Sequence, residues 1–343
     1  MRKRLLSILQ YVIFLGGGLF LVWWQLRSMT ESEAAAFRQA MSLADYRLVV
    51  PVIVISLLSH LSRAMRWKLL MKPLDYRPSL KNVFSVVMIG YLANAAVPRL
   101  GEVLKCTLLA RYEKLHFDKL VGTIIVERMF DLLCYIIFIG LTVLIQIDLV
   151  GGYVKGKLST VADTAGLPIW AKLLLVILVI TFIIWFLRLL RKNFPANKVI
   201  LKVNSFVRGL IEGVKTIKEL KQRKLFLAHT LFIWSMYLLQ IYIGFSVMES
   251  TAHLGIRPAF SVLTLATLAM IATPGGIGSF PIFVKETLLI YGILSPAGTA
   301  FGWLLWGANT GIVIITGLAA LLLLPVINRK RNEVNSIYTS ENL

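Results

Sequence analysis

Six charged residues of this sequence fall in two short groups. They are Arg99, Glu102 and Lys105 in the first group and Glu127, Arg128 and Asp131 in the second. Residues three or four positions apart meet on one side of a helix. A charge at membrane depth costs about 2.5–3.5 kcal/mol on insertion scales, so such charges usually pair with one another. We therefore expect a paired network between the two groups.

This network has two interpretations. In the first, Arg99, Lys105 or Arg128 binds an anionic headgroup, because an arginine fork donates two hydrogen bonds to a phosphate at once. Backbone N–H groups at a helix that starts near Gly101 also attract an anion. In the second, the network is an ion-pair clamp that holds the surrounding helices and contacts no substrate. Acid–base catalysis is disfavoured, because no nucleophile motif accompanies the carboxylates.

Two apolar segments that position these charges break at the same motif, L-A-x-x-A-x-P. The structural breaks are expected at Pro98 and Gly101 in the first segment and at Pro274 and Pro281 in the second. Proline removes a backbone donor, and glycine permits turns that other residues resist. Paired interrupted segments point to a substrate site in transporters built from repeats. Gly275, Gly276 and Gly278 are therefore expected to line a headgroup site, or else a purely structural re-entrant loop.

The composition indicates a polytopic membrane protein, since 57% of the 343 residues are hydrophobic and only 16% are charged. Several stretches exceed the roughly 18 apolar residues that suggest a membrane-crossing helix. Full spans are expected at residues 5–26, 47–62, 121–147, 170–190, 225–247 and 300–326. No stretch between them approaches the roughly 50 residues of an independent soluble domain. We expect an all-α membrane helix bundle that forms a single transmembrane domain over residues 1–343.

The net charge of +20 would suggest a nucleic-acid partner in a soluble chain. Here the basic residues cluster in loops and at the termini, as the positive-inside rule requires, so no nucleic-acid partner is expected. All basic clusters fall inside only if the broken segments, about 83–112 and 258–293, each enter and leave on one face. We therefore expect six full spans plus two re-entrant helix pairs that open to opposite faces. Inverted repeats are expected over 47–147 and 225–326, with both termini in the cytoplasm.

Three further patterns carry expectations about packing. The cytoplasmic linker 191–224 has apolar residues at helical spacing, which fits either an amphipathic helix on the inner leaflet or one that packs on neighbouring spans. Gln240 and Asn309 fall in mid-span and are expected to hydrogen-bond between helices. Gly307 and Gly311 form a G-x-x-x-G motif, which predicts close helix packing within the chain.

No metal site and no cofactor are expected. The two cysteines, Cys106 and Cys134, and the four histidines lack metal-ligand spacing. The glycine-rich stretch after the second break lacks both the Walker lysine and the full G-x-G-x-x-G pattern, which argues against nucleotide binding.

Three motifs resemble, in order and spacing, the lysylphosphatidylglycerol synthase transmembrane family, also called flippase-like. They are Pro98-Arg99-Leu100-Gly101-Glu102, Glu127-Arg128-x-x-Asp131 and Pro274-Gly275-Gly276-Ile277-Gly278. The resemblance covers nearly the whole chain and implies lipid handling, since relatives are linked to hopanoids and polyprenyl-linked sugars. The soluble transferase of the best-known member is not expected here. Phe280 and Pro281 stand where the family pattern leads us to expect a glutamate, which argues against a catalytic role for the later Glu286.

We therefore expect a lipid translocase, flippase-like or scramblase-like, that moves a phospholipid or a polyprenyl-linked lipid across the cytoplasmic membrane. Its partners are membrane lipids, with an anionic headgroup as the expected ligand. Movement would be downhill or coupled to an ion gradient. Two alternatives remain: a membrane-embedded lipid-modifying transferase with Glu102 or Asp131 as its base, and a non-catalytic partner subunit of a lipid-modifying enzyme.

Overall fold

The computed structural model describes residues 16–25, 27–97, 99–157, 174, 178 and 198–340, with the side chains of 147–157, 198–207 and 330–340 left out. Within these ranges every regular element is helical, which confirms the all-α prediction. Residues 16–25 form an N-terminal helical segment. The helices that follow are α2 (Glu31–Ser42), α3 (Val49–Met71), α4 (Leu80–Ala96), α5 (Leu100–Glu113), α6 (Phe117–Lys157), α8 (Lys198–Glu219), α9 (Arg223–Phe245), α10 (Glu249–Ala252), α11 (Ile256–Ala272), α12 (Ser279–Ile290) and α13 (Ser295–Ser340). Short 3-10 turns are η1 (Tyr46–Leu48), η2 (Lys72–Leu74) and η3 (Pro274–Gly276).

In the described part of the chain, four helical stretches are long and apolar enough to cross a membrane. They are Tyr46–Leu74, Phe117–Gln146, Arg223–Phe245 and Ser295–Arg329. These coincide with four of the predicted spans. The predicted span at 170–190 and much of that at 5–26 lie outside the described residues. The span predicted at 47–62 is longer than expected, because α3 continues as helix to Met71.

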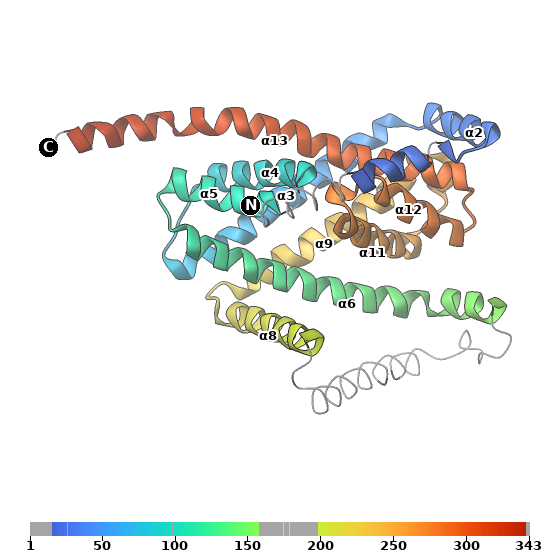
Figure 1. Ribbon diagram of the computed structural model, residues 1–343, viewed down its shortest axis with the longest axis horizontal. Coiled ribbons are helices and arrows are strands. Elements are labelled where there is room, and N and C mark those ends of the chain that lie inside the picture. Colours follow the sequence, from blue (N-terminus) through green and yellow to red (C-terminus); the bar gives the residue numbers. More distant parts are fainter. Residues whose placement is uncertain are drawn as a thin grey trace. The chain divides into compact units, whose positions relative to one another are not determined.

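The chain divides into two compact units, Met1–Ile124 with Leu220–Leu343, and Ile125–Glu219. In the first unit α3 packs along α9, and α13 packs along both α4 and α12 (Figure 1). Each of the two predicted helix pairs is present, since α4 packs against α5 and α11 packs against α12.

The second unit contains most of α6 and the helix α8. Gly209 and Gly213 of α8 lie against Met129 of α6, where a Cβ on Gly213 would be 3.2 Å from the Met129 Cβ. Ile217, on the same side of α8, is buried. The C-terminal half of α8 therefore packs on α6, as one of the two interpretations of the linker expected.

The order of helix lengths is the same in the two predicted repeats. The helices α3 and α9 each have 23 residues, and α4 and α11 each have 17. A shorter helix follows in both cases, α5 with 14 residues and α12 with 12, and then a long one, α6 or α13.

The first helix of each pair ends at the residue before the motif proline. Val97 has φ −137° and ψ 114°, and Thr273 has φ −130° and ψ 153°. Proline pushes the preceding residue out of the helical region, which explains both ends. The last amides still donate within the helix, Val97 to the Ala93 carbonyl at 2.8 Å and Thr273 to the Ala269 carbonyl at 3.2 Å.

The close packing predicted at Gly307 and Gly311 does not involve any residue that the structure describes. No described atom lies within 4 Å of a Cβ added at either position. The close approaches of α13 occur elsewhere: a Cβ on Gly302 would lie 2.8 Å from the Pro281 Cα, and one on Gly317 would lie 2.7 Å from the Leu92 Cβ. The face of α13 that packs closely is therefore the one that carries Gly302, against α12, and Gly317, against α4.

Candidate functional site: the junction of the two helix breaks

The two interrupted segments meet at their breaks. The turn η3 packs against α4, and a Cβ added to Gly275 would lie only 3.4 Å from the Cα of Ala95. Both residues belong to the L-A-x-x-A-x-P regions that were singled out in the sequence. The structure thus brings together two stretches that are far apart in the chain, and it does so at the points where each helix stops.

The residue after the motif proline is left-handed in both breaks. Arg99 has φ 67° and Gly275 has φ 59°. The following amides close equivalent turns, Leu100 to the Val97 carbonyl at 3.2 Å and Gly276 to the Thr273 carbonyl at 3.0 Å. Glycine adopts this backbone freely, whereas an L-residue such as arginine loses about 1–2 kcal/mol. A strained residue of this kind is a reason to look for function.

Arg99 is exposed, and its side chain makes no hydrogen bond or ion pair with any residue that the structure describes. It precedes the first turn of α5 and does not form part of that helix. Leu100 and Val103 beside it are also exposed, at 38% and 51%. The first break therefore presents one positive charge next to apolar surface.

At the start of α5 one of the predicted backbone N–H groups, that of Gly101, already has a partner. The Gly101 N–H donates to the Asn94 Oδ1 at 2.8 Å, and the Asn94 Nδ2 donates to the Glu102 Oε1 at 3.4 Å. Gly101 also touches the backbone of α4, since a Cβ there would overlap the Gly90 carbonyl oxygen. This hydrogen bond holds α5 against α4. The two backbones touch at this point, so no anion fits between them.

The second break is a tight glycine turn. Gly276 and Gly278 are left-handed, with φ 71° and 72°. The amides of Gly276 and Ile277 bond to the Thr273 and Pro274 carbonyls within the turn. The Gly275 carbonyl accepts a hydrogen bond from the Trp306 Nε1 at 2.8 Å. These internal bonds shape the loop, and a headgroup role for its glycines stays a prediction.

The six predicted charged residues differ in their surroundings. Lys105 is buried, with its Nζ 4.7 Å from the Trp67 ring centroid, and Glu127 is fully buried. Partly buried positions are Glu102, Arg128 and Asp131. The first group of three belongs to one compact unit and the second group to the other. The predicted pairing between the two groups stays a prediction.

Two buried arginines on α3 were not among the predicted site residues, because they lie just beyond the span expected at 47–62. Arg66 is fully buried, and its Nη1 donates to the Thr230 Oγ1 at 3.2 Å. Arg63 is 9% exposed, and its Nη2 donates to the Tyr237 hydroxyl at 3.1 Å. The available signal was the run of apolar residues that continues α3 beyond them. Buried charge is therefore present on α3 as well as on α5.

A polar layer crosses the first unit close to the breaks. The Gln240 Nε2 donates to the Asn309 Oδ1 at 2.7 Å, which confirms the expected bond between helices α9 and α13. The Ser56 hydroxyl of α3 donates to the same oxygen at 3.2 Å. The His60 ring centroid lies 4.9 Å from that of Tyr91, the residue just before the motif on α4, with the two rings tilted by 49°. Polar side chains at this depth usually bond between helices.

A helical chain with four apolar stretches of spanning length and two interrupted helix pairs is a multi-pass membrane protein. Residues 7–317 match the family described as the lysylphosphatidylglycerol synthase TM region, and the chain belongs to that family.

Two curated relatives are UPF0104 membrane proteins. PH1989 of Pyrococcus horikoshii is 24% identical over 323 residues, which cover 85% of this chain and 88% of the relative. MJ1595 of Methanocaldococcus jannaschii is 27% identical over 93 residues, which cover 26% of this chain and 28% of that protein. No solved structure matches the chain.

Proposed function

We propose that this protein moves a lipid between the leaflets of the cytoplasmic membrane, and that the headgroup passes the junction of the two helix breaks. The meeting of Ala95 with Gly275 carries this proposal. Interrupted helices from two halves of a transporter commonly form its substrate site near the bilayer midplane. A backbone opened at this depth is tolerated where it is buried in protein or lines a wet cavity. The family's description adds a link to a phospholipid.

In this proposal Arg99 binds the phosphate of the headgroup. It is an exposed cation, strained in its backbone, beside the exposed apolar side chains of Leu100 and Val103. A lipid offers a matching pair of surfaces, because its phosphate suits a guanidinium and its chains suit apolar residues. Lys105 lies further along α5 than the break. Its side chain is buried, so it adds a positive charge inside the protein near the break.

The proposal includes an arrangement in the membrane. The segments 47–147 and 225–326 are inverted repeats, supported by the shared order of helix lengths. Both termini lie in the cytoplasm, supported by the basic residues of the loops. The lipid leaves chemically unchanged, and its movement is downhill or coupled to an ion gradient.

The test uses purified protein in liposomes that contain a fluorescent phosphatidylglycerol. Dithionite added outside destroys the label in the outer leaflet, so continued loss of fluorescence measures movement between leaflets. We expect the protein to accelerate this loss and Arg99→Gln to slow it about tenfold, as expected for a lost charge-assisted hydrogen bond. Arg111→Gln is the matched control, an exposed arginine on α5 outside the site. A wild-type protein that binds lipid but moves none, or a fully active Arg99→Gln variant, would contradict the proposal.

The same material separates the two alternatives. A transferase would leave a covalently altered lipid in the liposomes or in membrane extracts compared with those of a deletion strain. A partner subunit would co-purify with another membrane protein and be inactive without it. Unchanged lipid chemistry with altered leaflet distribution is the result that the translocase predicts.

A further inference from the structure

A buried glutamine at the end of the N-terminal segment has an unused donor. Gln25 is 5% exposed, and its Oε1 accepts a hydrogen bond from the Trp303 Nε1 at 3.2 Å. An indole N–H can only donate, so the amide oxygen must face Trp303 and the amide nitrogen must face away. Within the described chain the buried Nε2 of Gln25 has no hydrogen-bond partner. A buried donor of this kind calls for a partner.

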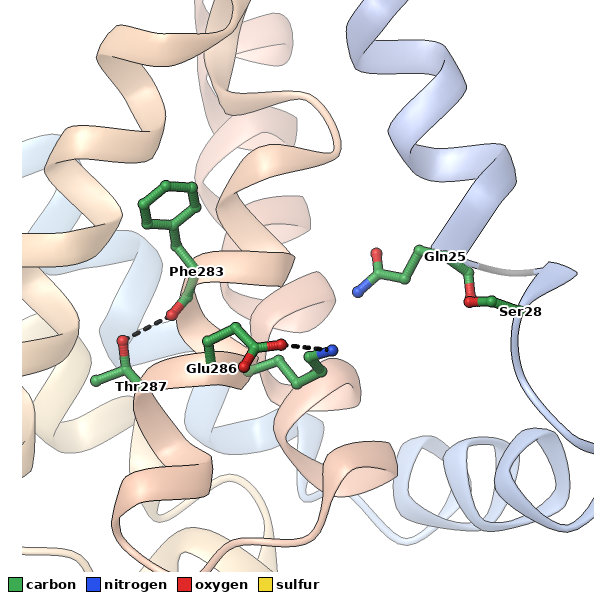
Figure 2. Close-up of polar contacts among 6 residues, drawn as sticks. Gln25, Ser28, Phe283, Glu286 and Thr287 are labelled. Carbon is green, nitrogen blue, oxygen red and sulfur yellow. Dashed lines mark hydrogen bonds and ion pairs between the residues drawn. The ribbon is translucent and has the colours of Figure 1, made fainter. Parts of the chain in front are cut away.

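Figure 2 shows the Gln25 side chain pointing toward Glu286 of α12, which forms an ion pair with Lys285. The Lys285 Nζ lies 2.8 Å from the Glu286 Oε1, and the two side chains are 22% and 58% exposed. Thr287, also on this helix, donates its hydroxyl to the Phe283 carbonyl at 2.6 Å (Figure 2). The unpartnered Gln25 Nε2 is therefore a buried donor on the side of the N-terminal segment that faces Glu286, and the Lys285–Glu286 pair is the more exposed group.

The N-terminal segment is held firmly in this place. A Cβ on Gly278 would lie 2.6 Å from the Gly18 carbonyl oxygen, so the segment's backbone touches the loop of the second break. The Ser28 hydroxyl donates to the Gln25 carbonyl at 3.2 Å (Figure 2). The position of the Gln25 amide is thus fixed by the glycine loop at one end and by Trp303 at its side chain.

Two carboxylates interact with the Lys285 ammonium group. Glu286 is its ion-pair partner, and Glu33 of α2 also interacts with Lys285 electrostatically. Hydrogen bonds from the Thr30 amide and hydroxyl hold the pKa of Glu33 below its ordinary value, so this carboxylate is ionised at neutral pH. Two donors and two carboxylates suit a ligand that carries both an anionic oxygen and an ammonium group. A free dianion is disfavoured by the carboxylates.

We propose that Gln25, Lys285, Glu286 and Glu33 bind the headgroup of a zwitterionic phospholipid. The Gln25 Nε2 and the Lys285 Nζ donate to a phosphodiester oxygen, and the two carboxylates attract the ammonium group. This site is distinct from Arg99 and rests on the proposed function as a second headgroup position beside the second break. Binding there is measurable without any transport, so the two proposals can fail separately.

The experiment measures thermal unfolding of the full-length protein in an uncharged detergent, with dihexanoyl phosphatidylethanolamine as the probe. We expect a saturable rise in the unfolding midpoint, with half-saturation at about tenfold higher lipid in Gln25→Glu and in Lys285→Gln. Gln25→Glu keeps an acceptor for Trp303 but replaces the donor with a carboxylate that repels the phosphate, so weaker binding with an unchanged unfolding midpoint in the absence of lipid separates binding from structure. Gln39→Glu, an exposed position on α2, is the matched control, and Lys285→Arg should retain binding.

Three results would overturn the assignment. One is unchanged lipid stabilisation in both Gln25→Glu and Lys285→Gln. Another is equal stabilisation by dihexanoyl phosphatidylglycerol or inorganic phosphate, which carry no ammonium group. A third is equal stabilisation by glycerophosphoethanolamine, which would identify a site for free phosphodiesters instead of lipid. If phosphatidylethanolamine binds through these residues but no lipid moves in liposomes, only the translocase proposal fails.

Discussion

Arg99→Gly is expected to slow lipid movement about tenfold without destabilising the protein. A left-handed backbone costs an L-residue about 1–2 kcal/mol, and Arg99 has φ 67°. Glycine removes this cost but adds about 0.5–1 kcal/mol of chain entropy to the unfolded state. The difference leaves the variant between about equal in stability and about 1.5 kcal/mol more stable than the wild type. Because Arg99 is exposed and bonds to no described residue, no favourable contact offsets this gain.

The assay pairs two measurements on one preparation. Thermal unfolding in detergent should give a midpoint that is unchanged or raised by about 1–3 °C, given the small shift per kcal/mol in a chain of this size. Dithionite quenching in liposomes should give a rate of leaflet exchange about tenfold below that of the wild type, as for Arg99→Gln. Arg99→Ala is the companion variant, since alanine carries the same backbone cost and the same loss of charge. It should be no more stable than the wild type and should move lipid as slowly as the glycine variant.

Two outcomes would refute this reasoning. A glycine variant that unfolds several degrees earlier would show that the arginine side chain stabilises the fold, as the ion-pair clamp interpretation holds. A glycine variant with wild-type leaflet exchange would show that the strain at Arg99 serves no headgroup. Loss of transport with retained or increased stability is the combination expected only of a ligand-binding residue.

Three further predictions concern packing and charge. Gly101→Ala should cost about 1–3 kcal/mol in the unfolding of the detergent-solubilised protein, because its Cβ overlaps the α4 backbone, whereas Gly122→Ala, with open space around it, should cost far less. Trp306→Phe removes the indole donor to the second break and should lower stability by about 1 kcal/mol in the same assay; an unchanged midpoint would mean that this bond is not needed. Thr30→Ala should bring the pKa of Glu33 closer to its ordinary value. The stability that Glu33 contributes at neutral pH would then be lost at a higher pH as the solution is acidified, measured as unfolding midpoint against pH.

The helix ends could be predicted from the sequence because their cause is local. A proline fixes the backbone of the residue before it, so Val97 and Thr273 had to leave the helix. The long apolar stretches were equally direct, since length and composition alone qualify a helix to span a membrane. Both inferences use only residues that are neighbours in the chain.

The inferences that failed depended on partners far away in the sequence. Arg63 and Arg66 lie beyond the span predicted at 47–62 and were not predicted to be buried, but Tyr237 and Thr230 on α9 accept their hydrogen bonds inside the fold. Nothing in the residues around an arginine reveals such a partner. The amide of Gly101 was expected to be free, although Asn94, across the break, already accepts its proton.

The close contacts of α13 among the described residues also depend on distant partners. The motif at Gly307 and Gly311 has the right spacing for close packing, but the neighbours of α13 lie along Gly302 and Gly317 instead. Spacing identifies a helix face that can pack closely. Which face does so is decided by the positions of α4 and α12, and these follow from the whole set of helices in the first unit.

The two breaks share a backbone and differ in the side chain that occupies its most demanding position. Gly275 takes the left-handed turn without cost, which shows that glycine satisfies this geometry in the same protein. Arg99 adopts the same backbone at a cost of about 1–2 kcal/mol, and its side chain makes no hydrogen bond with any described residue. Folding alone would therefore favour glycine at both sites. In the proposed function the arginine serves an anionic group that arrives and leaves, and exchanging Arg99 for glycine tests this function because the exchange does not weaken the fold.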